Sequence, residues 1–171
     1  MRVSAVMCTY NGARFVAEQV ESMLVQTVPI DELVVGDDAS TDGTLRIVEE
    51  TLARHDASGG RAVELVVLPR DPATHPRPYG VAGNFARALA AATGEVVVLS
   101  DQDDRWAPDR IERTVAAFAA HPEVDLVHAD ARLVDADGEP LGVTLFEALG
   151  ASDAELAQID AIDQHRARAR Q

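Results

Sequence analysis

Residues 96–106 read Val-Val-Val-Leu-Ser-Asp-Gln-Asp-Asp-Arg-Trp, an apolar run that passes directly into carboxylates. Four consecutive apolar residues predict a strand that is covered on both faces of a sheet. Two carboxylates about 5 Å apart repel by roughly 3 kcal/mol at an effective dielectric near 20, so Asp101, Asp103 and Asp104 at one strand end suggest a bound cation. Oxygen ligands of this kind favour Mg²⁺ or Mn²⁺, shared with a phosphate group. The alternative is a solvated loop in an acidic protein.

The composition of the whole chain limits its partners. The chain has 171 residues and a formal net charge of -14, and all 15 of its Lys and Arg residues are arginine. This length predicts one domain with a substantial core. The charge argues against nucleic acid or an anionic membrane as a direct partner, because both bind basic surfaces. The absence of lysine excludes a Schiff-base lysine and a Walker-type phosphate lysine.

The location of the protein is predicted from its single cysteine and its apolar runs. Cys8 excludes an internal disulfide and is expected to be a small buried side chain, which fits a reducing cytoplasm. No apolar stretch approaches the length of a membrane span, and the first residues enter a strand-like run without a signal peptide. We therefore expect a soluble cytoplasmic protein, attached at most peripherally to the inner membrane face through partners.

Strand and helix patterns alternate along the chain. Strands are predicted at 3–7, 33–36, 62–68, 96–99 and 126–129, and helices around 16–24, 45–52, 81–92 and 108–118. Asn11 is available to cap the first helix. A hairpin is predicted at 132–139, and an Ala-rich, loosely attached helix from Ser152. The alternation predicts an α/β layer fold with a mostly parallel sheet, as one domain over 1–150 with a tail over 151–171.

Three strand exits should converge at the carboxyl edge of this sheet, where parallel sheets bind ligands. They carry Tyr10, Asp38 and the carboxylates that begin at Asp101. An aromatic ring can lie against a base, a carboxylate can accept from a base N–H, and an acidic pair can hold a metal on phosphates. A glycine-rich dinucleotide turn is absent, because only Gly12 follows the first strand. The sequence therefore predicts a nucleotide-diphosphate site.

These residues resemble the inverting nucleotide-sugar glycosyltransferases of family two, which have the GT-A fold, a Rossmann-like three-layer sandwich. The match covers residues 2 to about 142. The matching stretches, in order, are Cys8-Thr9-Tyr10-Asn11-Gly12, Gln26-Thr27, residues 37–44, Asn84-Phe85, Gly94-Glu95 and residues 101–106. Asn-Phe followed by Asp-Gln-Asp-Asp-x-Trp is similar to the rhamnosyltransferase-like branch, which builds bacterial surface polysaccharides.

The resemblance implies roles for individual residues. Tyr10 and Asp38 would hold the base, with Thr9 as a further pocket residue, while Asp101 approaches the ribose and Asp103 ligates Mn²⁺ or Mg²⁺. The donor would be a nucleotide-diphosphate sugar of the uridine or thymidine type, and the acceptor a saccharide or a lipid-linked molecule. Transfer with inversion would use a carboxylate base to activate the acceptor hydroxyl.

The base and the acceptor-binding part are expected to be missing, because the family places them on a later segment. Within the chain, Asp130 is the candidate base. Two other functions stay open: a truncated, non-catalytic nucleotide-sugar-binding module, and a sugar nucleotidyltransferase. The latter needs a Gly- and Arg-rich signature after the first strand and a following lysine, which this sequence does not have.

Three other positions have two interpretations each. Arg70 and Arg77 either reach the diphosphate from the long loop at 69–80 or are solvated. Trp106 either lines the sugar pocket or plugs the space beneath its loop. Asp37 either touches the ligand or orients the turn.

Overall fold

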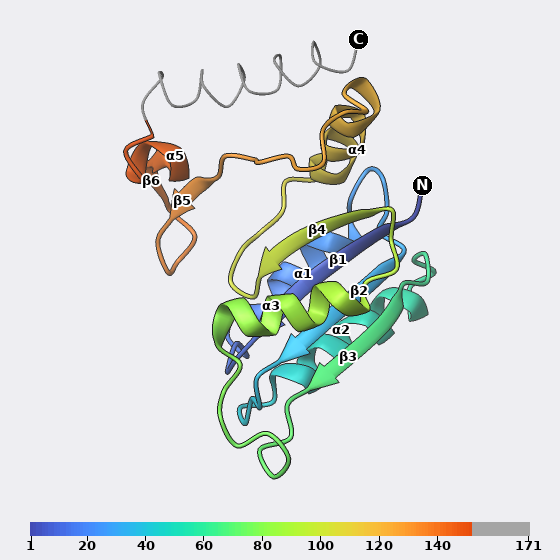
Figure 1. Ribbon diagram of the computed structural model, residues 1–171, viewed down its shortest axis with the longest axis vertical. Helices are drawn as coiled ribbons and strands as arrows, with labels where there is room; N and C mark the ends of the chain where they lie inside the picture. Colours follow the sequence, from blue (N-terminus) through green and yellow to red (C-terminus); the bar gives the residue numbers. More distant parts are fainter. Residues whose placement is uncertain (152–171) are drawn as a thin grey trace. The chain divides into compact units, whose positions relative to one another are not determined.

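The computed structural model describes residues 1–151, which fall into two compact units (Figure 1). Met1–Val115 forms the first unit, and the second begins at Ala116. The predicted tail from Ser152 lies outside the described residues, and the predicted domain limit at residue 150 stays a prediction. Within residues 1–151, no helix is both long enough and apolar enough to cross a bilayer.

A four-stranded parallel sheet forms the centre of the first unit. Its strands pair in the order β3-β2-β1-β4: β1 (Val3–Thr9), β2 (Glu32–Asp37), β3 (Glu64–Pro69) and β4 (Val96–Asp101). One helix follows each strand: α1 (Val16–Leu24), α2 (Thr44–Ala57), α3 (Gly80–Ala91) and α4 (Arg110–Ala120), the last of which continues into the second unit. The predicted α/β fold with a mostly parallel sheet is confirmed.

The strand order decides which face of the sheet each helix covers. Crossovers between parallel strands are right-handed, and the chain steps in one direction from β1 to β2 to β3 but returns across the sheet to β4. Helices α1 and α2 therefore cover one face and α3 covers the other, as Figure 1 shows. The direction reverses between β1 and β4, and such a switch point is where open α/β sheets bind ligands.

Apolar packing covers the face of the sheet beneath α3. Val6, Val34 and Ala88 are fully buried together, and Phe85 and Cys8 pack against them. Burial raises the pKa of the Cys8 thiol to about 12. The thiol is therefore protonated and acts as a small apolar side chain, but it is partly buried and not fully buried as predicted.

A buried carboxylate, that of Glu32, lies at the amino edge of the sheet. Glu32 is 1% exposed and accepts hydrogen bonds from the Ser4 hydroxyl and from the backbone N and Oγ1 of Thr93, at 2.9 and 2.8 Å. Burial alone would raise the pKa of Glu32, but these bonds and nearby Arg2 lower it below its ordinary 4.5. The stabilisation of the fold by the Glu32 carboxylate is thus present at neutral pH, and it is lost as the pH falls through the lowered pKa of Glu32.

The second unit is built around a hairpin. β5 (Arg132–Val134) pairs antiparallel with β6 (Pro140–Thr144), which confirms the predicted hairpin, and α5 (Leu145–Ala148) begins in a capping box between Thr144 and Glu147. The strand predicted at 126–129 is wrong: this segment has no regular structure, and Leu126 is 67% exposed. A strand needs a neighbour for its backbone groups, and none of the strands within residues 1–151 pairs with it.

Candidate functional site

The two carboxylates at the end of β2 have separate partners. Asp37 is buried and accepts hydrogen bonds from Thr9 Oγ1 at 2.7 Å and from Ser40 N at 2.8 Å. Asp38 instead bonds to the loop before α3 and to the first residue of that helix. Successive residues of an extended chain point to opposite faces, so neighbouring carboxylates serve different elements. Asp37 therefore orients the turn after β2. Of the two interpretations from the sequence, contact with the ligand or orientation of the turn, these contacts favour the second.

Asp38 joins β2, the segment after β3 and helix α3. Its Oδ1 accepts from Arg70 Nε at 2.6 Å and from Tyr79 N at 3.1 Å, and its Oδ2 accepts from Gly80 N at 3.0 Å. Burial alone would raise the pKa of Asp38, but these hydrogen bonds and the Arg70 charge lower it below its ordinary 3.8. Asp38 is therefore a carboxylate at neutral pH, already held on three sides.

The ion pair between Arg70 and Asp38 was not predicted. The Arg70 side chain is only 8% exposed, so it is not solvated. The signal lies in the strand register: Pro69 pairs with Asp37, so the next residue of each strand, Arg70 and Asp38, continues side by side. An arginine that directly follows the strand beside an aspartate was therefore the pattern to look for.

Thr9 and Tyr10 end β1 in different environments. Thr9 is 2% exposed, and its hydroxyl is used by Asp37, so it braces the β2 exit. Tyr10 is 60% exposed, and the side-chain amide of Gln102 accepts from its backbone N at 2.9 Å and donates to its backbone O at 3.2 Å. The Tyr10 ring is thus accessible while its backbone is fixed to the loop after β4.

Asn11 joins the loops that follow β1 and β2. It has a φ of 50°, its backbone N donates to Ser40 Oγ at 2.9 Å, and its Oδ1 accepts from Thr41 N at 2.9 Å. The expectation that Asn11 caps the first helix is wrong, because the N-cap of α1 is Phe15. The short asparagine side chain tolerates this left-handed conformation and spans the two loops instead. Asn11 thus connects the loop after β1 to the loop after β2.

The Gln102 side chain approaches Gly12 closely. A Cβ at Gly12 would lie 2.2 Å from Gln102 Oε1, closer than any real contact. The backbone N of Gly12 also donates to Thr44 Oγ1 at 2.8 Å. The β1 exit is therefore fixed to the loops after both neighbouring strands, β2 and β4.

The acidic cluster, Asp101, Asp103 and Asp104, begins at the end of β4. Burial, and then repulsion from Asp104 and Asp103, raises the pKa of Asp101 above its ordinary 3.8. Burial and repulsion from Asp103 likewise raise the pKa of Asp104. The carboxylates are thus close enough to disfavour the charge of Asp101 and Asp104, and a cation among them would relieve that repulsion.

Protein ligands alone do not make a metal centre here. Within residues 1–151, no three or more His, Cys, Asp or Glu side chains are grouped so that they could hold a metal ion. Mg²⁺ is commonly held by one or two carboxylates, with substrate phosphates and water completing its shell. The acidic cluster fits this kind of site, in which the ligand supplies the remaining oxygens.

Helix α1 and the residues that follow it support the end of β4 and the loop after β4 through buried polar groups. Gln19, which is fully buried, donates to the hydroxyl of Ser100, and the Ser22 hydroxyl accepts from Trp106 N at 3.0 Å. Gln26 Nε2 donates to Ala107 O at 2.8 Å. Trp106 is 3% exposed and packed beneath the loop, which favours its interpretation as a plug. The sequence indicated the carboxylates but not the glutamines and serines that position them.

The predicted base-binding and acidic residues meet at one edge. Asp37 pairs with Thr9 across β2 and β1, and Asp101 pairs with Cys8 across β4 and β1. Asp38 and Asp101 are thus separated by two strand spacings and by an offset of two residues along the strands, roughly 12 Å in all. Tyr10, at the end of the intervening strand, lies between them. This span is comparable with that from the base to the ribose and first phosphate of a nucleotide.

Asp130 belongs to the second unit. Its Oδ1 accepts from Ala131 N at 2.8 Å and Phe146 N at 3.0 Å. The hydrogen bond from Phe146, helped by weaker ones, lowers the pKa of Asp130 below its ordinary 3.8. A general base works best with a pKa raised toward the working pH, so the contacts of Asp130 fit a role in joining the hairpin to α5.

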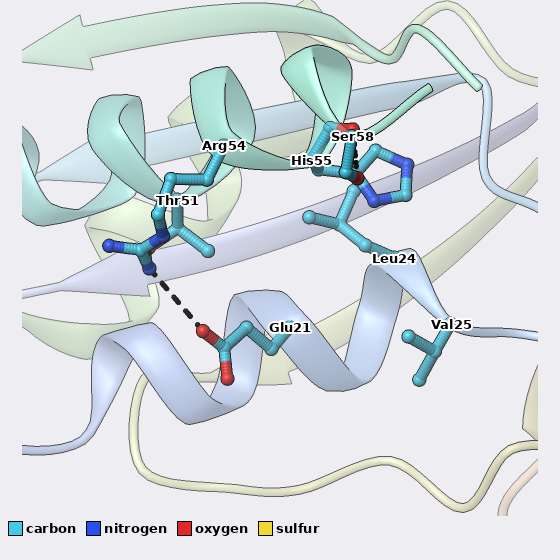
Figure 2. A pocket seen from close by; sticks show the side chains of 7 residues that line it. All are labelled: Glu21, Leu24, Val25, Thr51, Arg54, His55 and Ser58. Atoms are coloured by element: carbon cyan, nitrogen blue, oxygen red, sulfur yellow. Dashed lines mark hydrogen bonds and ion pairs between the residues drawn. The ribbon is translucent and has the colours of Figure 1, made fainter. Parts of the chain in front are cut away.

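A separate pocket lies between α1 and α2 (Figure 2). Arg54 and Glu21 form an ion pair across it at 3.3 Å. Both helices end beside the pocket, and each runs back toward the start of the next strand. The pocket is therefore at the amino edge of the sheet, away from the carboxylates. Its lining residues are Glu21, Leu24, Val25, Thr51, Arg54, His55 and Ser58.

The parallel sheet, its switch point and the helices on both faces define a doubly wound α/β protein. The model of glycosyl transferase family 2 matches residues 4–141. The chain belongs to this family, and the predicted GT-A fold is confirmed by its structural neighbours. The rhamnosyltransferase-like branch stays a prediction.

Two curated relatives come from Bacillus subtilis. The putative glycosyltransferase EpsE is 35% identical over 126 residues, which are 74% of this chain and 41% of EpsE. The putative teichuronic acid biosynthesis glycosyltransferase TuaG is 30% identical over 139 residues, 81% of this chain and 50% of TuaG. The chain thus spans half or less of the length of these relatives.

Two solved structures share the fold. TarS of S. aureus in complex with UDP-GlcNAc has a TM-score of 0.59 and 29% identity, over 71% of this chain and 32% of TarS. The mannosyltransferase PcManGT from Pyrobaculum calidifontis, in complex with GDP-Man and Mn²⁺, has a TM-score of 0.59 and 31% identity, over 78% of this chain and 35% of PcManGT.

Proposed function

We propose that the first unit binds a nucleotide-diphosphate sugar together with Mn²⁺ or Mg²⁺, as the donor-binding part of an inverting glycosyltransferase. The observation that carries this proposal is the convergence of Tyr10, Asp38 and the acidic cluster on the carboxyl edge of one sheet. Family membership supports it, and so do the nucleotide sugars bound to the two structural neighbours.

The base would occupy the β1 and β2 end of this edge. The exposed Tyr10 ring offers a flat apolar surface for a base to stack on. Asp38, kept ionised by its hydrogen bonds, would accept an N–H of the base. Thr9 would act indirectly, by bracing Asp37 beneath them. We propose a uridine or thymidine donor, whose base presents one N–H in its ring.

The ribose and diphosphate would occupy the β4 end. Asp101 would approach the ribose hydroxyls, and Asp103 would be the principal ligand of the cation. The carboxylates fit a divalent cation because they are hard oxygen donors that currently repel one another. A cation bound there supplies positive charge to the departing nucleotide diphosphate. Gln102 and Gln19 would keep the acidic cluster in place during this step.

The acceptor would be a saccharide or a lipid-linked molecule used in the synthesis of bacterial surface polysaccharides. The naming of TuaG for teichuronic acid biosynthesis supports this role. Inversion requires a base that takes the proton of the acceptor hydroxyl. We do not assign that base to Asp130, because its backbone hydrogen bonds lower its pKa.

Calorimetric titration with UDP tests the proposal. We expect UDP to bind, and to bind about tenfold or more tightly with Mn²⁺ than with EDTA, a difference of about 1.4 kcal/mol or more. Uridine is the matched control, because it lacks the phosphates and should show no metal dependence. Absence of binding by UDP, dTDP and GDP in the presence of Mn²⁺ would contradict the proposal.

A further inference from the structure

The chain contains two asparagines, and only one of them is followed by glycine. Asn11 precedes Gly12 in the loop after β1, whereas Asn84 lies inside helix α3. An asparagine side-chain amide can be attacked by the backbone nitrogen of the next residue, and glycine hinders this attack least because it has no side chain. The Asn11–Gly12 pair is therefore a chemically reactive point of the chain.

The side-chain amide of Asn11 is accessible and polarised. Asn11 is exposed, and its Oδ1 accepts a hydrogen bond from Thr41 N at 2.9 Å. This oxygen becomes negatively charged when a nucleophile adds to Cγ, and a backbone N–H directed at a developing oxyanion favours such an addition. The Asn11 amide is thus prepared to act as the electrophile.

The Gly12 nitrogen, in contrast, is held back. Gly12 is buried, and its N–H donates to Thr44 Oγ1 at 2.8 Å. The Thr44 hydroxyl donates in turn to Asp42, and this bond lowers the pKa of Asp42 below its ordinary 3.8. Neither group is a base strong enough to take an amide proton. The nitrogen therefore keeps its proton, and it cannot attack while the hydrogen bond to Thr44 is closed.

We propose that Asn11–Gly12 is a deamidation site that the Thr44 hydroxyl keeps closed in the folded protein. When the hydrogen bond to Thr44 opens, the Gly12 nitrogen forms a bond to Asn11 Cγ. The Cγ–Nδ2 bond breaks, and the side-chain nitrogen leaves as ammonia with the proton of the Gly12 amide. Water then opens the resulting succinimide on either side of its nitrogen, which gives aspartate or isoaspartate at position 11.

Both products change the carboxyl edge of the sheet. Each adds a negative charge to an edge that already carries Asp38 and the acidic cluster. Isoaspartate also adds one atom to the main chain between the nitrogens of residues 11 and 12. These nitrogens donate to Ser40 Oγ and Thr44 Oγ1, so the added atom disturbs the spacing of two bonds that join the loops. Opening of one hydrogen bond thus leads to a permanent change.

The test follows deamidation by peptide mapping with mass spectrometry, during incubation of the folded chain at mildly alkaline pH. We expect the mass gain at Asn11 and not at Asn84, whose buried amide donates to Gly36 O at 2.7 Å. Thr44→Val should deamidate about fivefold faster than the wild type, the effect of losing one hydrogen bond. Thr44→Ser keeps the hydroxyl and the wild-type rate. Thr51→Val, which removes a hydroxyl from another buried threonine of α2, should also leave the rate unchanged.

Incubation in urea separates the effect of the Thr44 hydrogen bond from the reactivity of the dipeptide itself. The denatured wild type and denatured Thr44→Val should deamidate at Asn11 at one common rate, faster than the folded wild type. Equal rates in the folded and the denatured wild type overturn the inference, even if Thr44→Val does not fold. Equal rates in folded Thr44→Val and the folded wild type, or a mass gain at Asn84 before Asn11, also overturn it.

Discussion

Asp38→Ala is expected to lower the free energy of unfolding by about 3–5 kcal/mol, the cost of leaving one member of a buried ion pair without its partner. Arg70 would keep its charge at 8% exposure, and the N–H groups of Tyr79 and Gly80 would lose their acceptor at the start of α3. Urea denaturation followed by circular dichroism measures the change. The stabilisation by Asp38 should also disappear as the pH falls through its lowered pKa.

The control is an ion pair on the surface. Arg46 and Glu50 are paired at 2.7 Å, but both are more than half exposed, so Glu50→Ala should cost less than about 1 kcal/mol. An Asp38→Ala protein within about 1 kcal/mol of the wild type would contradict the buried pair. Because Asp38→Ala changes stability and binding together, Asp38→Asn, which keeps the shape, is the better variant for nucleotide affinity.

Asp103→Asn is expected to abolish the metal dependence of UDP binding. The substitution removes one negative charge from the acidic cluster and replaces a carboxylate oxygen with an amide, a poorer ligand for a hard cation. UDP affinity with Mn²⁺ should fall roughly tenfold or more, to the value measured with EDTA. Calorimetry in both buffers gives the four affinities that are needed.

Asp109→Asn is the matched control for Asp103→Asn. Asp109 is an exposed carboxylate after the acidic cluster and is 3.9 Å from Arg113, so its change removes the same charge from a different place. It should keep the full effect of Mn²⁺. Equal metal dependence in Asp103→Asn and the wild type would move the assignment to Asp104 or exclude a metal site.

The sequence predicted the parts of the fold that depend on local patterns. Apolar runs identified the four strands of the sheet, and their alternation with helical patterns predicted parallel pairing. The convergence of Tyr10, Asp38 and Asp101 followed, because parallel strands end at one edge. The prediction of a strand at 126–129 failed because apolar alternation does not reveal whether a neighbouring strand exists. Strand formation depends on that partner.

Contacts between distant side chains could not be predicted from local patterns. Gln102 and Gly12 are far apart in the sequence, and their fit depends on a close approach that only the folded chain shows. The sequence placed Arg70 in a long polar loop, which indicated either a solvated side chain or one that reaches the ligand. Its burial instead follows from the register of β3 against β2. The motif over residues 37–44 indicated a ligand, yet several of its side chains bond to the β1 loop. The sequence patterns thus predicted the candidate site but not the contacts that support it.

The location of the bound cation tests the proposed donor site most directly. Mn²⁺ broadens the NMR signals of nearby amides, so spectra of the ¹⁵N-labelled chain with UDP and a trace of Mn²⁺ report where it binds. We expect the strongest broadening at residues 101–104, with weaker effects at Tyr10 and Asn11 across the β1–β4 switch point. Broadening centred on Glu21 and the pocket between α1 and α2, or spread evenly over the chain, would contradict a nucleotide–metal site at the carboxyl edge.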